Sequence, residues 1–168
     1  MMDTNQFADL LTSFARRPVP PVTGRHVYVW HGELAALKAA LPGGLTRELD
    51  LYGLAAGLSR TPYALDEARR LLQGAVQTWL RDHAPPAGQR QVIVVTGGAL
   101  LERYRLPLDA FFQASGDTRM VVFVVSPVET SFGPRRPLPP YVVVQPAAAL
   151  TYLHAAVGES AVVGGLPT

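Results

Sequence analysis

Apolar residues recur at helical spacing in several stretches of the chain. Residues 3–17 carry Phe7, Leu10, Leu11 and Phe14 at positions i, i+3, i+4 and i+7, which predicts an amphipathic N-terminal helix. Prolines follow this stretch and end the helix. The same reasoning predicts helices over residues 33–41, 65–83, 106–114 and 147–156, and a helical turn over residues 52–59.

Runs of β-branched and aromatic residues alternate with these helices. They predict strands over residues 26–30, 47–51, 91–95, 119–125 and 141–144. The runs QVIVV and RMVVFVV are apolar without interruption, which is typical of strands buried on both faces of a parallel sheet. The alternation predicts an α/β fold: a three-layer sandwich with a mostly parallel sheet of about five strands, helices on both faces, and an additional N-terminal helix.

The length of 168 residues fits a single domain. Residues 1–22 are expected to form the N-terminal helix and a Pro-rich linker, residues 23–157 the α/β core, and residues 158–168 a flexible tail. Hydrophobic residues make up 48% of the chain and charged residues 17%, so the chain can bury a core and disorder of the whole chain is excluded.

The composition also excludes several kinds of chemistry. The chain has no cysteine, which rules out disulfides, thiolate metal sites and a cysteine nucleophile. Its four histidines are scattered without the i, i+4 spacing of a helical metal site, so neither a metal nor a cofactor is expected. No apolar run reaches the ~18 residues of a membrane helix and no secretory signal is visible, which predicts a cytoplasmic protein without a membrane partner.

In an open parallel sheet, ligands bind beyond the carboxyl ends of the strands. After the first predicted strand, Gly32 and Lys38 have the spacing of the first glycine and the lysine of a phosphate-binding loop, G-x-x-x-x-G-K-[ST]. Leu37 replaces the second glycine and Ala39 the magnesium-binding hydroxyl. Because this stretch is rich in helix formers, we expect the helix to begin about one turn early and the anion-binding loop not to form.

Two later strand ends complete the candidate site. Thr96 follows the third predicted strand, where an NTPase carries the acid that holds Mg²⁺. Ser126 ends the fourth, where its hydroxyl either bonds a phosphate or starts a turn. The positions expected to retain traces of a cofactor site are therefore Gly32, Lys38, Thr96 and Ser126. At the end of the second strand, Asp50 is expected to face solvent or to cap a neighbour.

Arginines gather at two places that are candidate partner-binding surfaces. Arg103, Tyr104 and Arg105 form a small basic and aromatic cluster, and Arg135 and Arg136 precede a Pro-rich segment. The formal net charge is only +2 and basic residues come at most in pairs, which is weak support for a nucleic-acid interface. The favoured interpretation of the Pro-rich segment is a stiff connection to the strand that follows it, and contact with another protein is the candidate function of both clusters.

The order of these elements resembles a P-loop NTPase core, and most closely the small P-loop proteins encoded in BREX-type phage-defence systems. The stretches that carry the resemblance are the Gly32/Lys38 segment after HVYVW, the segment from Glu48 to Leu72, and the segment from Val92 to Pro127. Together they span about residues 25–145. The second loop glycine, the Ser/Thr and the terminal acid of the third strand are missing.

The resemblance therefore implies a pseudo-NTPase, an accessory subunit that does not hydrolyse ATP. Its partners would be the other protein subunits of a defence complex, with an indirect association with DNA as a further expectation. Two alternatives stay open. A small nucleotide-binding enzyme with a divergent phosphate loop would bring His31, Gly32, Lys38, Thr96 and Ser126 to one pocket, and a nucleic-acid-binding accessory protein would use its arginines.

Overall fold

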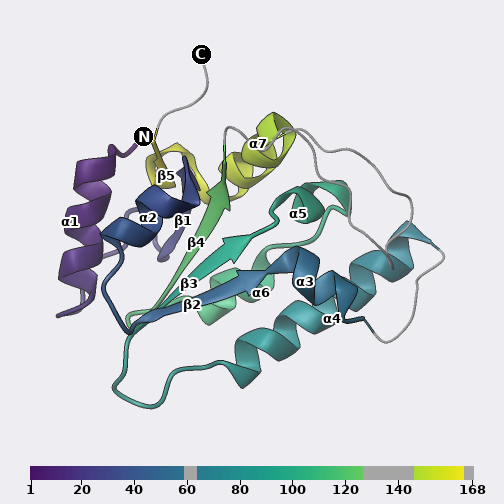
Figure 1. Cartoon of the computed structure of the whole chain (residues 1–168), viewed down its shortest axis with the longest axis horizontal. Coiled ribbons are helices and arrows are strands. Elements are labelled where there is room, and N and C mark those ends of the chain that lie inside the picture. The colour runs from purple at the N-terminus through teal and green to yellow at the C-terminus, as the bar shows by residue number, and fades with distance from the viewer. Residues whose placement is uncertain (59–63, 127–145, 165–168) are drawn as a thin grey trace.

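A five-stranded parallel sheet forms the centre of the molecule. The computed structural model describes residues 1–58, 64–126 and 146–164, and its strands lie in the order β2-β3-β4-β1-β5 (Figure 1). All four strand pairings are parallel. The strands are β1 (Val27–His31), β2 (Thr46–Asp50), β3 (Gln91–Thr96), β4 (Arg119–Val125) and β5 (Val162–Val163). The predicted parallel α/β sheet is confirmed.

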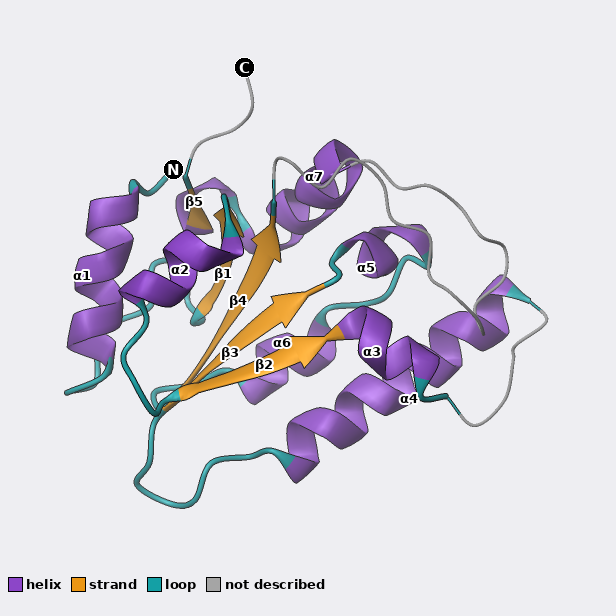
Figure 2. Cartoon of the chain, in the orientation of Figure 1, coloured by secondary structure: helices purple, strands orange, loops and turns teal. Residues whose placement is uncertain are grey.

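Helices cover both faces of this sheet. Helices α1 and α2 lie on one face, and α4, α5, α6 and α7 on the other (Figure 2). The helices are α1 (Thr4–Phe14), α2 (Leu34–Ala40), α3 (Leu51–Ala56), α4 (Leu65–Asp82), α5 (Ala99–Arg103), α6 (Asp109–Ala114) and α7 (Pro146–Val157). A short 3-10 helix, η1 (Glu159–Ala161), precedes β5. Within the described ranges, no helix combines the length and the apolar character that crossing a membrane requires.

The two apolar strands form the core. Every residue of β4 is buried, and so is β3 as far as Val95, which confirms that these strands are covered on both faces. At the N-terminal end of the sheet, Arg119 is only 9% exposed. Its guanidinium donates to Gln91 Oε1 at 2.8 Å and to the Leu80 carbonyl at 2.7 Å, which ties the end of α4 to β3 and β4.

Helix α1 has the predicted amphipathic face. Asp3 and Gln6 form a capping box at its start, and Phe7 packs on Tyr28 and Trp30 of β1. Next to this contact His26 is 1% exposed, with Nε2 donating to the Val19 carbonyl at 2.9 Å and Nδ1 3.0 Å from the Tyr28 hydroxyl. Burial lowers the pKa of His26 and raises the pKa of Tyr28 to about 12.

The fifth strand of the described sheet comes from a stretch for which the sequence pattern predicted no strand. The predicted strand 141–144 lies outside the described residues, and the observed fifth strand, β5, comes from residues expected to be a flexible tail. Val162 and Val163 are fully buried and pair with β1, and Met2 pairs with Val163 on the far side. A strand of two residues is too short to produce a period-two pattern, which explains why it was not predicted.

The helix predicted over residues 106–114 begins later than expected. Residues 106–108 link α5 to α6 instead, with Leu106 and Leu108 buried against the core. Arg105 turns the chain before them with a φ of 49°, a left-handed conformation that ends α5. Helix α5 itself was not predicted, because its five residues are too few to show a helical period.

Candidate functional site

The topology creates a crevice at the carboxyl ends of the central strands. Helix α2, which follows β1, lies on one face of the sheet, and α7, the next described helix after β4, lies on the other (Figure 2). Strands β1 and β4 are neighbours in the sheet. Where adjacent parallel strands send their connections to opposite faces, the strand ends are left uncovered and ligands bind there.

A cavity of about 470 Å³ lies at this carboxyl edge. This volume is in the range of small-molecule sites. Thr96 and Gly97 at the end of β3, and Val124 and Ser126 at the end of β4, line one part of it. Its remaining lining residues are Leu34, Asp50 and Tyr52. The structure therefore brings two of the four predicted cofactor positions, Thr96 and Ser126, to one cavity.

Gly32 follows the carboxyl end of β1, but its backbone N–H is already hydrogen-bonded within the sheet. Its N–H donates to the Val125 carbonyl at 3.1 Å, which extends the pairing of β1 with β4. A Cβ at this position would lie 3.0 Å from the Trp30 indole nitrogen, which itself donates to the Glu33 carbonyl at 3.1 Å. Only Gly32 and Glu33 separate β1 from α2, so the chain does not curl into an anion-binding loop. The predicted early start of this helix is confirmed.

Lys38 lies away from the cavity. It is in the last turn of α2, and its Nζ is 2.8 Å from Glu48 Oε1 on β2. Both side chains are about half exposed. The lysine of a phosphate loop stands at the start of its helix, where it reaches the β- and γ-phosphates. The enzyme alternative requires Lys38 to lie at the same pocket as Thr96 and Ser126, and this prediction is wrong.

The charged groups near the cavity are acidic. Asp50 lines the cavity and caps α3, with Oδ1 accepting from the Tyr52 N–H at 3.0 Å. This confirms the expectation that Asp50 caps a neighbouring element. Glu33 is bonded to the lining residue Ser126, with Oε1 accepting from the Ser126 hydroxyl at 3.2 Å. Among the described lining residues there is no lysine or arginine. A phosphate here would face carboxylates with no compensating cation, so the cavity suits an uncharged or cationic group.

The glycine pair after β3 is explained by packing. Gly97 has a φ of 78°, and a Cβ there would lie 3.0 Å from the Tyr52 ring. Gly98 precedes α5, and a Cβ there would touch the Leu153 side chain at 3.4 Å. Both glycines permit close contact with side chains of this chain, which accounts for them without a phosphate contact.

The predicted partner-binding cluster is only partly on the surface. Tyr104 is 1% exposed, and its carbonyl accepts from Arg69 Nε at 2.7 Å, so its side chain belongs to the core. Arg103 lies over the Tyr104 ring at 5.7 Å, and Arg105 is exposed and lies 5.8 Å from the Tyr152 ring. The other two candidates, Arg135 and Arg136, are outside the described residues.

A second cavity, of about 540 Å³, runs beside the edge strand β2. It was not predicted from the sequence. Trp79 of α4 and His83, which caps the C-terminal end of α4, line it with their rings stacked at 4.1 Å. The i, i+4 spacing of the two residues was the available signal. Trp79 is half-buried at this edge.

The described residues contain no group of three or more potential metal-binding side chains. Comparison with known proteins found no match to a family model, a curated protein or a solved structure.

Proposed function

We propose that this chain is a non-catalytic pseudo-NTPase that acts through protein contacts as an accessory subunit of a BREX-type phage-defence complex. The observation that carries the proposal is the position of Lys38. It lies in the last turn of α2 and is paired with Glu48, so it does not reach the carboxyl edge of the sheet.

Phosphate-loop chemistry needs backbone N–H groups around the phosphate, a lysine on its terminal oxygens, and a hydroxyl on the metal. Here the Gly32 N–H is bonded to the Val125 carbonyl, Lys38 to Glu48, and the hydroxyl position is Ala39. Thr96 stands where an acid would hold Mg²⁺ through water. All four losses favour a scaffold without ATP turnover.

The assignment to a phage-defence complex rests on the resemblance of about residues 25–145. The five-stranded parallel sheet with helices on both faces is compatible with it. The enzyme alternative keeps Thr96 and Ser126 at one cavity but has no cation beside them. The nucleic-acid alternative loses one member of its cluster, because Tyr104 is buried.

A complementation experiment in the native bacterial host tests the proposal. Deletion of the gene is expected to abolish phage restriction, measured as efficiency of plating. The wild-type chain and the Lys38→Ala chain are both expected to restore it, because Lys38 holds no nucleotide. A Leu37→Asp chain, which places a carboxylate at a fully buried position, serves as the reference for lost function.

Equal expression of the wild-type and Lys38→Ala chains is checked by immunoblot. If Lys38→Ala fails to restore restriction at equal expression, the subunit depends on this lysine and the non-catalytic proposal is refuted. If deletion leaves restriction unchanged, the assignment to a defence complex is refuted.

A further inference from the structure

The two edge strands of the sheet differ in whether another segment of the described chain pairs with their outer side. At the β5 edge, Met2 pairs with Val163: the Met2 N–H donates to the Val162 carbonyl at 2.9 Å, and the Met2 carbonyl accepts from Gly164 at 3.2 Å. The chain therefore closes this edge with its own N-terminus. At the other edge, β2 pairs only with β3 among the described residues.

The outer edge of β2 presents free strand-pairing groups. The Val92 N–H donates to the Leu45 carbonyl at 2.9 Å, and Thr46 is in register with Val92. In a parallel pair, alternate residues bond the same neighbour, so Arg47 turns its N–H and C=O toward β3. The backbone groups of Thr46 and Glu48 then point outward, and such groups are a template for an additional strand.

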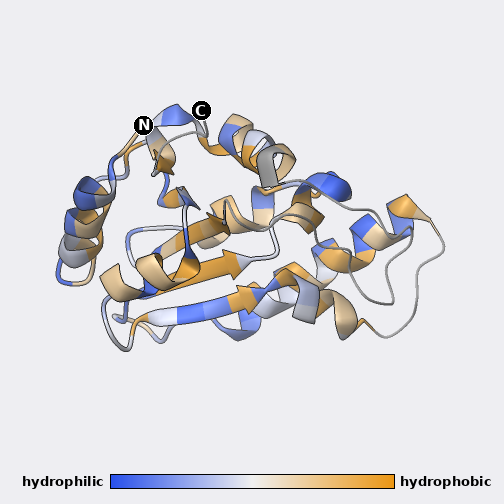
Figure 3. Cartoon of the chain, turned by 45° about the horizontal axis from the view of Figure 1, so that its top comes forward, coloured by the Kyte–Doolittle hydropathy of each residue, from blue (hydrophilic) through white to orange (hydrophobic). Residues whose placement is uncertain are grey.

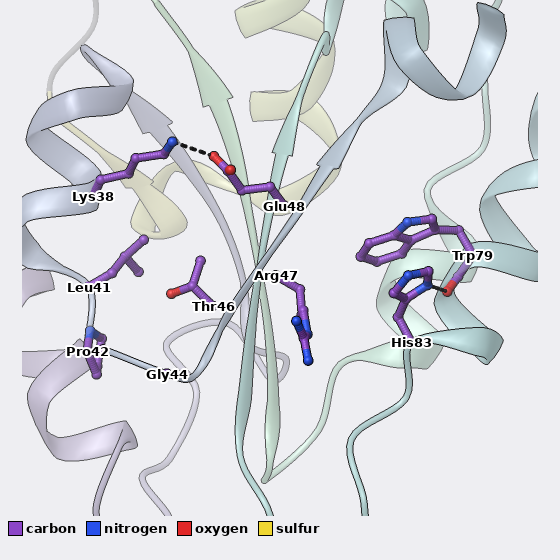
Figure 4. A pocket seen from close by; sticks show the side chains of 10 residues that line it. Lys38, Leu41, Pro42, Gly44, Thr46, Arg47, Glu48, Trp79 and His83 are labelled. Carbon is purple, nitrogen blue, oxygen red and sulfur yellow. Dashed lines mark hydrogen bonds and ion pairs between the residues drawn. The ribbon is translucent and has the colours of Figure 1, made fainter. Parts of the chain in front are cut away.

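A groove runs along this edge. It is the cavity of about 540 Å³, between α2 on one side of β2 and α4 on the other (Figure 4). Arg47 points toward Trp79 and His83, and Glu48 points the opposite way, toward α2. The His83 ring is held in place by its Nδ1, which donates to the Trp79 carbonyl at 2.9 Å. The stacked rings form a flat wall for a side chain of an incoming strand.

The charges along β2 differ between its two faces. Alternation places Thr46, Glu48 and Asp50 on the face toward α2 and Arg47 on the face toward α4. Arg47, Glu48 and Asp50 are exposed, and Figure 3 shows β2 largely in the hydrophilic colour, unlike β3 and β4. Glu48 pairs with Lys38 of α2 through Oε1, and its half-exposed carboxylate has a second oxygen that can accept from another cation. A matching strand would carry basic residues on the first face and an acidic residue on the second.

This charge pattern disfavours a second copy of the chain as the occupant. Every two-fold antiparallel register that pairs more than one residue of β2 brings like charges together. Glu48 meets Glu48, or Arg47 meets Arg47, or Glu48 meets Asp50, depending on the register. Like charges directly opposite each other destabilise strand pairing. This charge pattern favours a segment of a different protein as the occupant.

We propose that β2 receives an extended segment of a partner protein, which adds as a sixth strand with basic side chains beside Glu48 and Asp50 and an acidic side chain beside Arg47. This inference rests on the proposed function, because it names the surface through which the subunit contacts its complex. Main-chain hydrogen bonds would provide the attachment, and the alternating charges would select the partner.

A designed peptide tests the inference on the full chain. The probe is the acetylated, amidated peptide Thr-Lys-Val-Lys-Glu-Lys-Thr, in which the lysines share one face. Its control is the charge-reversed peptide Thr-Glu-Val-Glu-Lys-Glu-Thr. Amide hydrogen exchange measured by NMR is expected to slow at least about tenfold at Glu48 when the first peptide saturates the chain, because an outward N–H gains a partner. The charge-reversed peptide is expected to bind about tenfold more weakly.

Substitutions at Glu48 separate backbone pairing from charge. Glu48→Pro removes the outward N–H while leaving the pairing with β3, and is expected to abolish binding. Glu48→Ala keeps the N–H and is the matched control, expected to bind the lysine peptide with reduced affinity. Glu48→Lys keeps both the N–H and the fold, and is expected to shift the preference toward the charge-reversed peptide even if Glu48→Pro does not fold.

Three results would overturn the inference: no slowing of exchange at Glu48 with either peptide, equal affinity for both peptides, or a dimer of the chain in sedimentation that Glu48→Pro dissolves. Nucleotide binding is measured separately, by titration of the chain with Mg-ATP in the absence of peptide. A chain that binds the lysine peptide and also binds ATP would refute the pseudo-NTPase proposal alone.

Discussion

Restoring the phosphate-loop residues is expected to destabilise the chain without creating nucleotide binding. Leu37 is fully buried and contributes to the core beneath α2. Leu37→Gly removes a buried isobutyl group, which costs about 2 to 5 kcal/mol, and places glycine inside a helix, which costs about 1 kcal/mol more. The expected loss of about 3 to 6 kcal/mol is a large part of the ~5 to 15 kcal/mol that stabilises a typical domain.

The second substitution, Ala39→Ser, returns the missing hydroxyl at an exposed helical position and is expected to cost only about 0.5 kcal/mol. Even together, the two changes leave Lys38 in the last turn, paired with Glu48, and the Gly32 N–H bonded to Val125. The double variant is therefore expected to gain no response to Mg-ATP.

Urea unfolding with and without Mg-ATP measures both effects. Leu37→Ala is the control that separates the buried cavity from the helix propensity of glycine. A ligand at ~100 times its Kd stabilises by ~2.7 kcal/mol, which such unfolding curves resolve. The reasoning is refuted if the double variant is stabilised by Mg-ATP, or if Leu37→Gly costs less than about 1 kcal/mol.

Three further predictions concern the fold. Burial lowers the pKa of His26, so the free energy of unfolding is expected to be highest above the unfolded pKa of 6.5 and to fall as the pH drops through 6.5 toward the lowered folded value. Urea midpoints measured across this range should show the fall. The His26→Gln chain, which keeps a hydrogen-bond donor, should show a flatter dependence on pH. Arg119→Met leaves the Leu80 carbonyl without its donor and is expected to cost about 2 to 3 kcal/mol in thermal unfolding, whereas an unchanged midpoint would mean that this buried contact contributes nothing. Gly97→Ala, at a φ of 78°, is expected to cost about 1 to 3 kcal/mol, and Gly43→Ala, with open space around it and no positive φ, should cost much less; equal costs would contradict the packing explanation.

The sequence pattern located the elements that have a clear period. The stripe of α1, the long α4 and the apolar runs of β3 and β4 were all predicted close to their observed bounds. These segments bury one helical face or two strand faces, and burial of that kind leaves a periodic signal in the sequence. The parallel sheet followed from their alternation.

What the sequence could not supply depends on contacts between distant residues. β5 has two residues, and its place in the sheet depends on pairing with β1 and with Met2. The direction of Lys38 depends on Glu48, a partner on another element. The burial of Tyr104 depends on how α5 packs, and α5 is too short to have a pattern of its own. Such features follow from tertiary packing rather than from local preference.

The most direct test of the central claim is calorimetric titration of the wild-type chain with Mg-ATP. The account predicts no heat of binding and no shift in the thermal unfolding midpoint, because neither Lys38 nor the Gly32 N–H is available to a phosphate. Saturable binding of Mg-ATP that Lys38→Ala abolishes would contradict it.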